Sequence, residues 1–386
     1  MSFQLTEEQE MVRLMTRDFA RKELEPEAAR RDKEAIFPLE VVKKMGQLGL
    51  LGMMVPVEYG GAGASAVSYC LALQEIAYSC ASTAVTMSVA NLSTEPLLKF
   101  GNEDQKMKYL CKLAQGELLG CFALTEPAAG SDPGSLSIRA EDKGNYYLIN
   151  GTKVFITHGQ YADIINLIAR TGPDKGSKGL SAFIVEKDTP GFSIGTREDK
   201  MGLRASNTVE LIFDDCRIPK ENLLGKEGLG FKIAMTALDS GRIGIASQAV
   251  GITRACLDES IKYARERKQF GKTISSFQAI QWMIADMATG LEAASLLTLS
   301  AARKKDRKMP FTKEASMAKL FASELANKSA YLALQIHGGY GYLKDFKVER
   351  LYRDARAASI YEGTSEIQRL VIARNLLKDQ SYGLYD

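Results

Sequence analysis

Near its end the chain carries a carboxylate in a setting where a side chain could do acid–base chemistry. Glu362 is followed at once by Gly363, and apolar residues at helical spacing resume from Ile367 to Leu376. A glycine lets a ligand approach the backbone, and Thr364 or Ser365 could cap the helix that follows. A carboxylate at such a junction, partly removed from water, could act as a general base. The residues alone do not separate this role from that of a solvated surface glutamate.

A second stretch, Cys121 to Asp132, is typical of a strand end followed by a loop of small residues. Thr125 and Ser131 offer hydroxyls, and Gly130 permits close backbone approach. A planar ligand with hydrogen-bonding edges would suit such a loop. An ordinary strand-to-loop transition has the same composition, so both interpretations stay open on these residues alone.

Further stretches combine aromatic, basic and small residues that could contact a large ligand. They are 153–159, 238–244, 265–272 with 277–278, and 335–341. In 265–272, arginines match the geometry of a pyrophosphate, although a basic run at a helix end is often only solvated. In 238–244, glycines flank an arginine within a predicted helix, which indicates close packing against a helix or a ligand.

The elements that must position these stretches predict an α+β fold with three domains. Residues 1–120 are predicted to form an N-terminal helical domain, 121–230 a middle antiparallel β domain, and 231–386 a C-terminal four-helix bundle. Thr6 to Gln9 forms a potential capping box, and Glu25-Pro26 should end the first helix.

Within the middle region, Asn150-Gly151 joins two β-prone runs in Tyr146–Thr157 and predicts a hairpin. Further strands are expected at 164–169, 180–185 and 208–213, and long helices at 230–263, 278–305 and 312–336. Gly61 to Ala66 matches the dinucleotide pattern Gly-x-Gly-x-x-Ala. However, no βαβ context surrounds it, so we predict a loop between helices.

Composition bounds the class of protein. The 386 residues carry a net charge of +3, which argues against a nucleic-acid binder that works through bulk charge. The six cysteines lack a Cys-x-x-Cys pair, so we expect a reducing compartment and no zinc or other metal site. The acidic N-terminus does not resemble a targeting peptide, and the longest apolar run, 48–57, is too short to span a membrane.

Taken together, these stretches resemble the signatures of the acyl-CoA dehydrogenases, flavoenzymes that desaturate an acyl-CoA at its α and β carbons. Tyr361 to Gln368 resembles the C-terminal signature of that family, and Leu124 to Asp132 its Leu-Thr-Glu-Pro-x-x-Gly-Ser-Asp signature. The stretches fall in family order and cover almost the whole chain. The segments between them look most like the short-chain acyl-CoA and butyryl-CoA dehydrogenases.

The resemblance assigns roles to particular residues. Glu362 is implied to be the catalytic base that takes the α-proton, and FAD is the implied cofactor. The implied FAD contacts are Phe122, Leu124, Thr125, Ser131, Phe155, Ile156, Thr157, Arg267, Phe270, Phe277, Gln278, Gln335, Ile336, Gly338, Gly339, Thr364 and Glu366. The implied acyl-CoA contacts are Ser131, Asp239, Arg242, Tyr361 and Gly363. Arg267 and Gln278 would reach the FAD of a neighbouring subunit.

The resemblance also implies a mechanism and partners. The thioester oxygen would accept hydrogen bonds from the backbone N–H of Glu362 and a flavin ribityl hydroxyl, and the β-hydride would pass to flavin N5. Burial between the flavin and the acyl chain should raise the pKa of Glu362. An electron-transferring flavoprotein would take the electrons. A homotetramer built as a dimer of dimers is expected, in the bacterial cytoplasm or as a mature mitochondrial matrix protein.

Two residues depart from the family pattern. Phe155 stands where a tryptophan is usual and could still cover a ring system, with less area. His158 stands where an asparagine is usual. It could tune a flavin, but a lone histidine is weak evidence, and we expect it to face solvent.

Other functions stay open at this point. An acyl-CoA oxidase would use the same residues, although the short length favours a dehydrogenase. A dehydrogenase of branched, cyclic or dicarboxylic acyl-CoA is a further alternative. The choice would depend on the pocket floor, expected at Ser88–Leu92 and Ser247–Val250. A non-enzymatic acyl-CoA-binding protein is disfavoured by Glu362.

Overall fold

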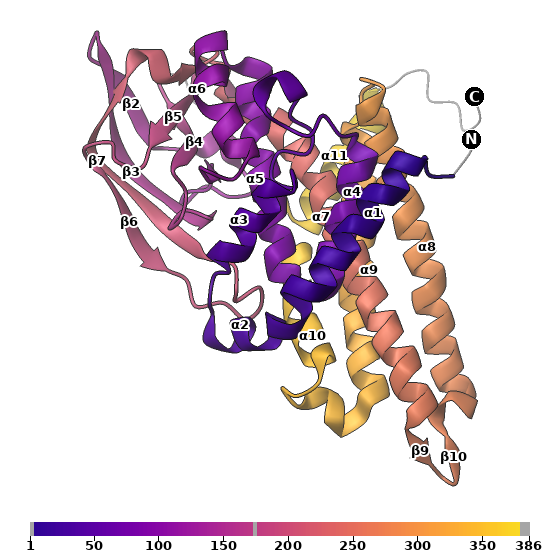
Figure 1. Cartoon of the computed structure of the whole chain (residues 1–386). Helices are drawn as coiled ribbons and strands as arrows, with labels where there is room; N and C mark the ends of the chain where they lie inside the picture. Colours follow the sequence, from indigo (N-terminus) through magenta and orange to yellow (C-terminus); the bar gives the residue numbers. More distant parts are fainter. Residues whose placement is uncertain (1–3, 173–175, 379–386) are drawn as a thin grey trace.

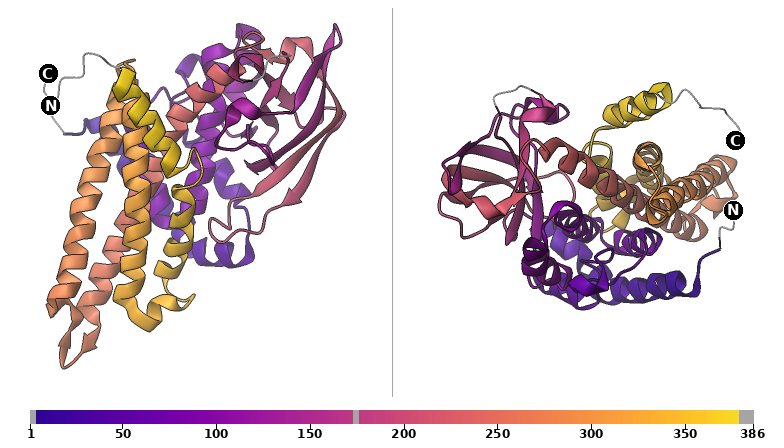
Figure 2. Two further views of the ribbon diagram at one scale, coloured as in Figure 1. Left: turned by 180° about the vertical axis from the view of Figure 1, so that it is seen from behind. Right: turned by 90° about the horizontal axis from the view of Figure 1, so that it is seen from above.

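The computed structural model describes residues 4–172 and 176–378. A β-sheet lies on one side, long C-terminal helices lie on the other, and the N-terminal helices pack between and beside them (Figure 1). The view from above in Figure 2 shows the same three parts. The predicted α+β architecture is confirmed.

The N-terminal region is helical. Its α-helices are α1 (Glu7–Phe19), α2 (Ala28–Glu34), α3 (Leu39–Gln47), α4 (Ala66–Ser79), α5 (Ala81–Phe100) and α6 (Glu103–Ala114). The predicted capping box is confirmed, because Thr6 Oγ1 accepts from the backbone N–H of Gln9 and the Gln9 side chain accepts from the N–H of Thr6.

The first α-helix does not reach Glu25-Pro26. It ends at Phe19, and the chain continues through a π-helical turn, Ala20–Leu24, and a 3₁₀ turn, Glu25–Glu27. Pro26 takes the early position of the new turn, where its missing N–H costs nothing. The glycine-rich stretch before α4 is a loop between helices, as predicted, and Gly61 packs directly against the backbone of Val55.

Eight strands form one mixed sheet. They are β1 (Gly120–Ala123), β2 (Arg139–Asp142), β3 (Tyr146–Thr157), β4 (Ile164–Arg170), β5 (Leu180–Glu186), β6 (Phe192–Arg197), β7 (Thr208–Pro219) and β8 (Leu223–Leu224). The strand order is β6-β7-β3-β2-β4-β5-β8, with β1 parallel to β4. Most neighbours are antiparallel, and the exceptions are the parallel pairs β1/β4 and β2/β4.

The hairpin predicted at Asn150-Gly151 is wrong. β3 runs straight through these residues and pairs with β7 on both sides of a register shift between Ile149 and Gly151. The positive φ that Asn-Gly favours serves a β-bulge, and the Asn150 side chain bonds Asp215 on β7. The hairpin between β2 and β3 turns instead at Gly144, whose φ is 88°.

The C-terminal region contains the three long helices that the sequence predicts, α7 (Gly230–Glu266), α8 (Gln278–Asp306) and α9 (Thr312–His337). The shorter helices α10 (Lys347–Ala358) and α11 (Ser365–Lys378) follow them. A short hairpin of β9 (Lys268–Gln269) and β10 (Lys272–Thr273) lies at the far tip (Figure 1). One face of α9 carries buried small residues, which lets helices approach closely: Ala315, Ala318, Ala322, Ala326, Ala330 and Ala333.

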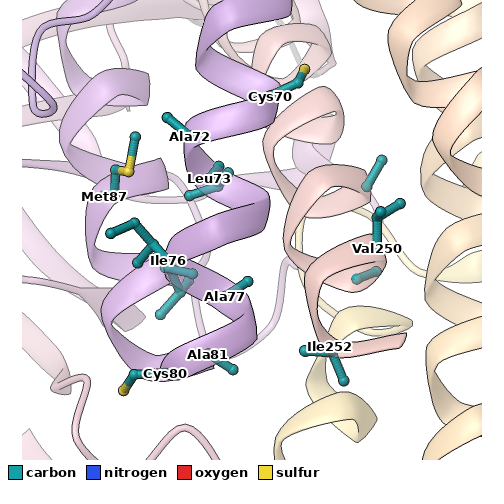
Figure 3. Close-up of a cluster of buried hydrophobic side chains, with 14 of the residues drawn as sticks. Cys70, Ala72, Leu73, Ile76, Ala77, Cys80, Ala81, Met87, Val250 and Ile252 are labelled. Atoms are coloured by element: carbon teal, nitrogen blue, oxygen red, sulfur yellow. The ribbon is translucent and has the colours of Figure 1, made fainter. Parts of the chain in front are cut away.

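The largest buried core joins the two helical regions. Figure 3 shows buried side chains of α4, α5 and α7 in this core, among them Leu73, Met87 and Ile252. This core fixes the middle of α7 in place. Within residues 4–172 and 176–378, every helix is too short or too polar to cross a membrane.

Candidate active site

The carboxylate of Glu362 lies in the interior, at the junction of α10 and α11. Its Oε2 atom is inaccessible to solvent and has no hydrogen-bond partner among the described residues, although other parts of the residue are accessible. The backbone of Glu362 has a φ of 55°, a left-handed conformation that residues other than glycine seldom adopt. A conformation of this kind persists only where the surroundings enforce it.

Helix α7 makes room for this carboxylate. A Cβ atom added at Gly241 would lie 2.5 Å from Glu362 Oε2. One turn further on, a Cβ at Gly244 would lie 2.5 Å from Ser88 Oγ and 2.6 Å from the Tyr69 hydroxyl. The predicted close approach at these glycines is therefore real. At Gly241 it serves the candidate base rather than helix packing alone.

Burial brings the pKa of Glu362 close to neutral pH. It raises this pKa to about 7, while the nearby Arg242 and Lys319 act in the opposite direction. A general base works best when its pKa lies near the working pH. The chain's own residues therefore already raise the pKa of Glu362, before any flavin or acyl chain buries it further.

The loop that carries the acid is held by hydrogen bonds to its carbonyl groups. Lys319 Nζ donates to Gly363 O at 2.7 Å. The Gln368 side-chain amide donates to Gly363 O at 2.9 Å and to Glu362 O at 3.0 Å. Thr364 caps α11, because its Oγ1 accepts from the N–H of Ile367 at 3.4 Å.

Asp239 and Arg242 form a partly satisfied polar group beside the acid. Arg242 Nη1 donates to Asp239 Oδ1 at 2.7 Å and to Ser316 Oγ at 3.4 Å, and Asp239 Oδ2 accepts from Thr312 at 2.5 Å. Arg242 Nε is buried with no partner among the described residues. An unsatisfied buried donor leaves capacity for a ligand at this point.

Five of the residues that the family resemblance assigns to the flavin lie on, or directly after, two strands of the sheet. Phe122 lies on β1, Leu124 and Thr125 directly follow it, and Ile156 and Thr157 end β3. The two segments meet where the N–H of Val154 donates to Thr125 O at 2.9 Å. Phe122 and Leu124 also pack against the hydrophobic cluster that contains the start of α7.

A buried ion pair supports this loop from beneath. Lys153 Nζ donates to Leu124 O at 2.7 Å and to Glu126 Oε1 at 2.9 Å. Burial lowers the pKa of Lys153 to about 8. Although burial opposes the charge of Glu126, Lys153 and hydrogen bonds from Ser137 lower its pKa overall. The pair therefore fixes the carbonyl that precedes Thr125.

A separate group of predicted residues lies at the far tip of the bundle. Arg267, Ile336, Gly338 and Gly339 line one open cavity of about 490 Å³. A Cβ atom added at either glycine would meet nothing within 4 Å, so backbone is exposed to the cavity. Gln335 precedes this segment on an exposed face of α9. At the same tip Phe270, 91% exposed, has its ring 6.1 Å from that of Phe277, which precedes Gln278.

The residues around Glu362 and the residues at the far tip lie far apart within one chain. Gly241 and Arg267 are separated by 26 residues of one helix, which corresponds to about 39 Å at 1.5 Å per residue. Of the remaining predicted contacts, Ser131 lies in the loop after β1, and Phe155, which is 64% exposed, lies on β3. Thr364 directly precedes α11 and Glu366 lies in its first turn, so both follow Glu362 closely in the chain.

His158 does not face solvent, so that prediction is wrong. It is fully buried, packs edge-on against Phe37 with a centroid separation of 5.8 Å, and its Nδ1 lies 3.3 Å from Gly120 O. Its Nε2 has no partner among the described residues. Burial lowers the pKa of His158 to about 4, so the ring is neutral at physiological pH.

Several residues at the site were missed in the sequence. Lys319 is buried on the alanine face of α9, and Gln248 bonds the Tyr361 hydroxyl. One signal for Lys319 was present. It lies four residues after Ala315 and three before Ala322, which is a helical spacing that places a lysine on an otherwise small, apolar face.

Comparisons with known proteins cover the whole architecture. Residues 6–117, 121–216 and 228–377 match the family descriptions "Acyl-CoA dehydrogenase, N-terminal domain", "middle domain" and "C-terminal domain". An "Acyl-CoA dehydrogenase" of Bacillus subtilis is 55% identical over 97% of this chain and 99% of that protein.

A further relative and a solved structure are also similar to this chain over almost its whole length. The mitochondrial "Short-chain specific acyl-CoA dehydrogenase" of Rattus norvegicus is 54% identical over 98% of this chain and 92% of its own length. The solved structure of butyryl-CoA dehydrogenase from Megasphaera elsdenii superimposes with a TM-score of 0.96 at 43% identity, covering 98% of this chain and 100% of that chain.

The buried His158 leads to a prediction about stability and pH. His158 binds a proton near pH 6.5 in the unfolded chain and only near pH 4 in the folded chain. The free energy of unfolding therefore decreases as the pH falls through this window. The loss should reach roughly 2 kcal/mol by about pH 5. In His158→Asn this component is absent, so melting temperature should fall less between about pH 7.5 and pH 5 than in the wild type. Equal falls in both proteins would contradict the burial of a neutral ring.

Proposed function

Because the chain belongs to the acyl-CoA dehydrogenase family, we propose that it converts a short-chain acyl-CoA to the trans-2-enoyl-CoA, with Glu362 removing the α-proton. The family makes the protein an oxidoreductase of the acyl-CoA dehydrogenase class. The role of Glu362 as the base is supported by its carboxylate, which is buried and has no hydrogen-bond partner among the described residues. The pKa of this carboxylate is about 7.

The chain's own groups prepare this carboxylate for proton abstraction. Its free Oε2 has no internal hydrogen bond to break before it accepts a proton. Low local polarity and a pKa of about 7 give it a strong tendency to take that proton. The buried Arg242 beside it leaves Nε available to a polar part of the substrate, which supports Asp239 and Arg242 as acyl-CoA contacts.

The residues present fit FAD as cofactor. Exposed aromatic rings at Phe155 and Phe270 would cover a planar ring system or its chain, and Gly338 and Gly339 leave backbone open for close approach. Phe122, Leu124, Thr125, Ile156 and Thr157 would hold the isoalloxazine end. FAD, when bound, would supply the acceptor for the β-hydride.

The separation along α7 supports a site shared between subunits. Arg267 lies about 39 Å from Gly241 along one helix, so in one chain it is far from the acid. A neighbouring chain that presents its Arg267 and Gln278 to the FAD held by this sheet domain would complete the site. We therefore propose that the active form is an oligomer, a homotetramer by family resemblance.

The face of α7 supports a short acyl group. Gly241, Gly244 and Gln248 follow at i, i+3 and i+7, so they share one face of the helix. Glu362 lies against Gly241, Ser88 and Tyr69 lie against Gly244, and Gln248 bonds the Tyr361 hydroxyl and donates to Ala81 O at 2.8 Å. Packed side chains therefore line this face within about 10 Å of Gly241. An electron-transferring flavoprotein is proposed as acceptor from the family resemblance.

Removal of the base tests the central proposal. Glu362→Gln keeps the shape of the side chain but cannot take a proton, so turnover with butyryl-CoA and an acceptor dye should fall by roughly 10³-fold or more. Flavin content and the binding of butyryl-CoA should stay near wild type, since the amide occupies the same space. Undiminished turnover in this variant would refute the role of Glu362, and oxygen uptake at the rate of dye reduction would identify an oxidase instead.

A panel of acyl-CoA substrates tests which length and shape of acyl group the protein prefers. The packed side chains near Gln248 predict the highest kcat/KM with butyryl-CoA and a value lower by roughly tenfold or more with octanoyl-CoA, because extra methylenes meet a hydrogen-bonded side chain. Branched and dicarboxylic acyl-CoA should also be poorer. Equal or higher kcat/KM with glutaryl-CoA or octanoyl-CoA would overturn the short-chain assignment while leaving Glu362 in place.

The tip residue Arg267 tests the shared site. Arg267→Ala removes a guanidinium that would pair with a pyrophosphate, so FAD should dissociate more readily. The measurement is the flavin-to-protein ratio after gel filtration at low protein concentration. Lys268→Ala is the matched control, since it removes a neighbouring exposed charge on the same hairpin. An unchanged ratio in Arg267→Ala would count against this contact.

A further inference from the structure

Lys319 is a buried cation next to the candidate base. It lies on α9 with no solvent exposure, among the small side chains Ala315, Ala318 and Ala322. A lysine is seldom fully buried unless something nearby repays the loss of hydration. Its Nζ donates to Gly363 O at 2.7 Å, and that carbonyl belongs to the residue after the acid.

The contact falls on a strained piece of backbone. Glu362 and Gly363 follow one another with φ values of 55° and 90°. Such a pair persists only where other groups hold it, and the donors that hold it here are Lys319 and the side-chain amide of Gln368. One donor comes from α9 and the other from α11, so the loop is fixed between two helices.

The two donors differ in charge. Gln368 is neutral, whereas Lys319 brings a positive charge close to an acid whose Oε2 finds no hydrogen-bond partner in the part of the chain that the structure describes. In a weakly polar interior such a charge acts over several ångströms without direct contact. Lys319 therefore supplies both a hydrogen bond to the loop and a positive charge near the acid, whereas Gln368 supplies hydrogen bonds alone.

We propose that Lys319 is the positioning residue of the base. Its ammonium group holds the Gly363 carbonyl, and with it the left-handed backbone of Glu362, and its charge favours the ionised carboxylate that proton abstraction requires. This inference deepens the proposed function and rests on it for the role of Glu362. Lys319 itself does not touch the reacting atoms.

Other charged groups around this pair belong to three elements. They are Asp239 and Arg242 on α7, Glu324 on α9, and Glu366 on α11. Arg242 also favours the ionised acid, and burial opposes it. Burial lowers the pKa of Lys319 itself to about 8, while Glu362 acts to raise it. At neutral pH the lysine thus still carries most of its charge, so its removal has a measurable consequence.

Two variants of similar shape separate charge from hydrogen bonding. Lys319→Met and Gln368→Met each remove one donor to Gly363 O, but only the first removes a charge. The ionisation of Glu362 is followed in the flavin-loaded protein by infrared absorption of its carboxyl group, as the difference from the Glu362→Gln form of each variant. The pH dependence of kcat/KM with butyryl-CoA is measured in parallel.

In Lys319→Met we expect the midpoint of Glu362 ionisation, and the acidic limb of kcat/KM, to move upward by about one pH unit, with a roughly tenfold loss of kcat/KM at about pH 6. In Gln368→Met turnover should fall while both midpoints stay within a few tenths of a unit of the wild type. Lys319→Gln, which keeps a neutral donor, should show the same upward movement and also serves if Lys319→Met fails to fold. Lys319→Arg should bring the midpoint back toward the wild type.

An infrared midpoint that is the same in Lys319→Met, Lys319→Gln and wild type would overturn the proposal, as would equal upward movements in the Lys319 and Gln368 variants. These outcomes are distinct from failure of the proposed function. If Glu362 is not the base, Glu362→Gln keeps its turnover, and the infrared titration still reports whether Lys319 favours ionisation of that carboxyl.

Discussion

The site depends on keeping an ionisable carboxylate in the interior with no hydrogen-bond partner for its Oε2 in residues 4–172 and 176–378. A rise in the pKa of Glu362 from 4.5 to about 7 corresponds to roughly 3 kcal/mol against the ionised form. Its left-handed backbone adds a further cost, of the order of 1 kcal/mol or more. An arrangement so unfavourable persists only because the helices around it are fixed by their own packing.

That packing comes from helices far apart in the sequence. Leu73 and Ile76 of α4, Met87 of α5 and Ile252 of α7 belong to one buried cluster (Figure 3). The alanine face of α9 lets the bundle helices come close together. The same close approach places Gly241 beneath the acid and leaves space there for no larger side chain. The core that stabilises the fold therefore also sets the polarity of the site.

The length of α7 has a second consequence. A single helix of 37 residues carries the floor of the acid's pocket near its beginning and the arginine that would bind a cofactor phosphate at its end. One chain cannot bring these ends together, so in the proposed function a neighbouring chain would supply the tip residues. Phe270 is exposed at this tip, and Gly338 and Gly339 leave backbone open there.

The sequence by itself determined the order and type of the elements, because periodicity, capping boxes and glycines act over a few residues. It predicted the long helices α7, α8 and α9 closely, and it singled out Glu362. Local signals failed where a distant partner decided: Asn150-Gly151 forms a bulge because β7 lies opposite, and His158 is buried because Phe37 packs against it. The burial of the acid, its pKa and the hydrogen bond from Lys319 arise only when α7, α9 and α11 converge, since solvation and charge depend on neighbours that the chain brings together from up to 121 residues away.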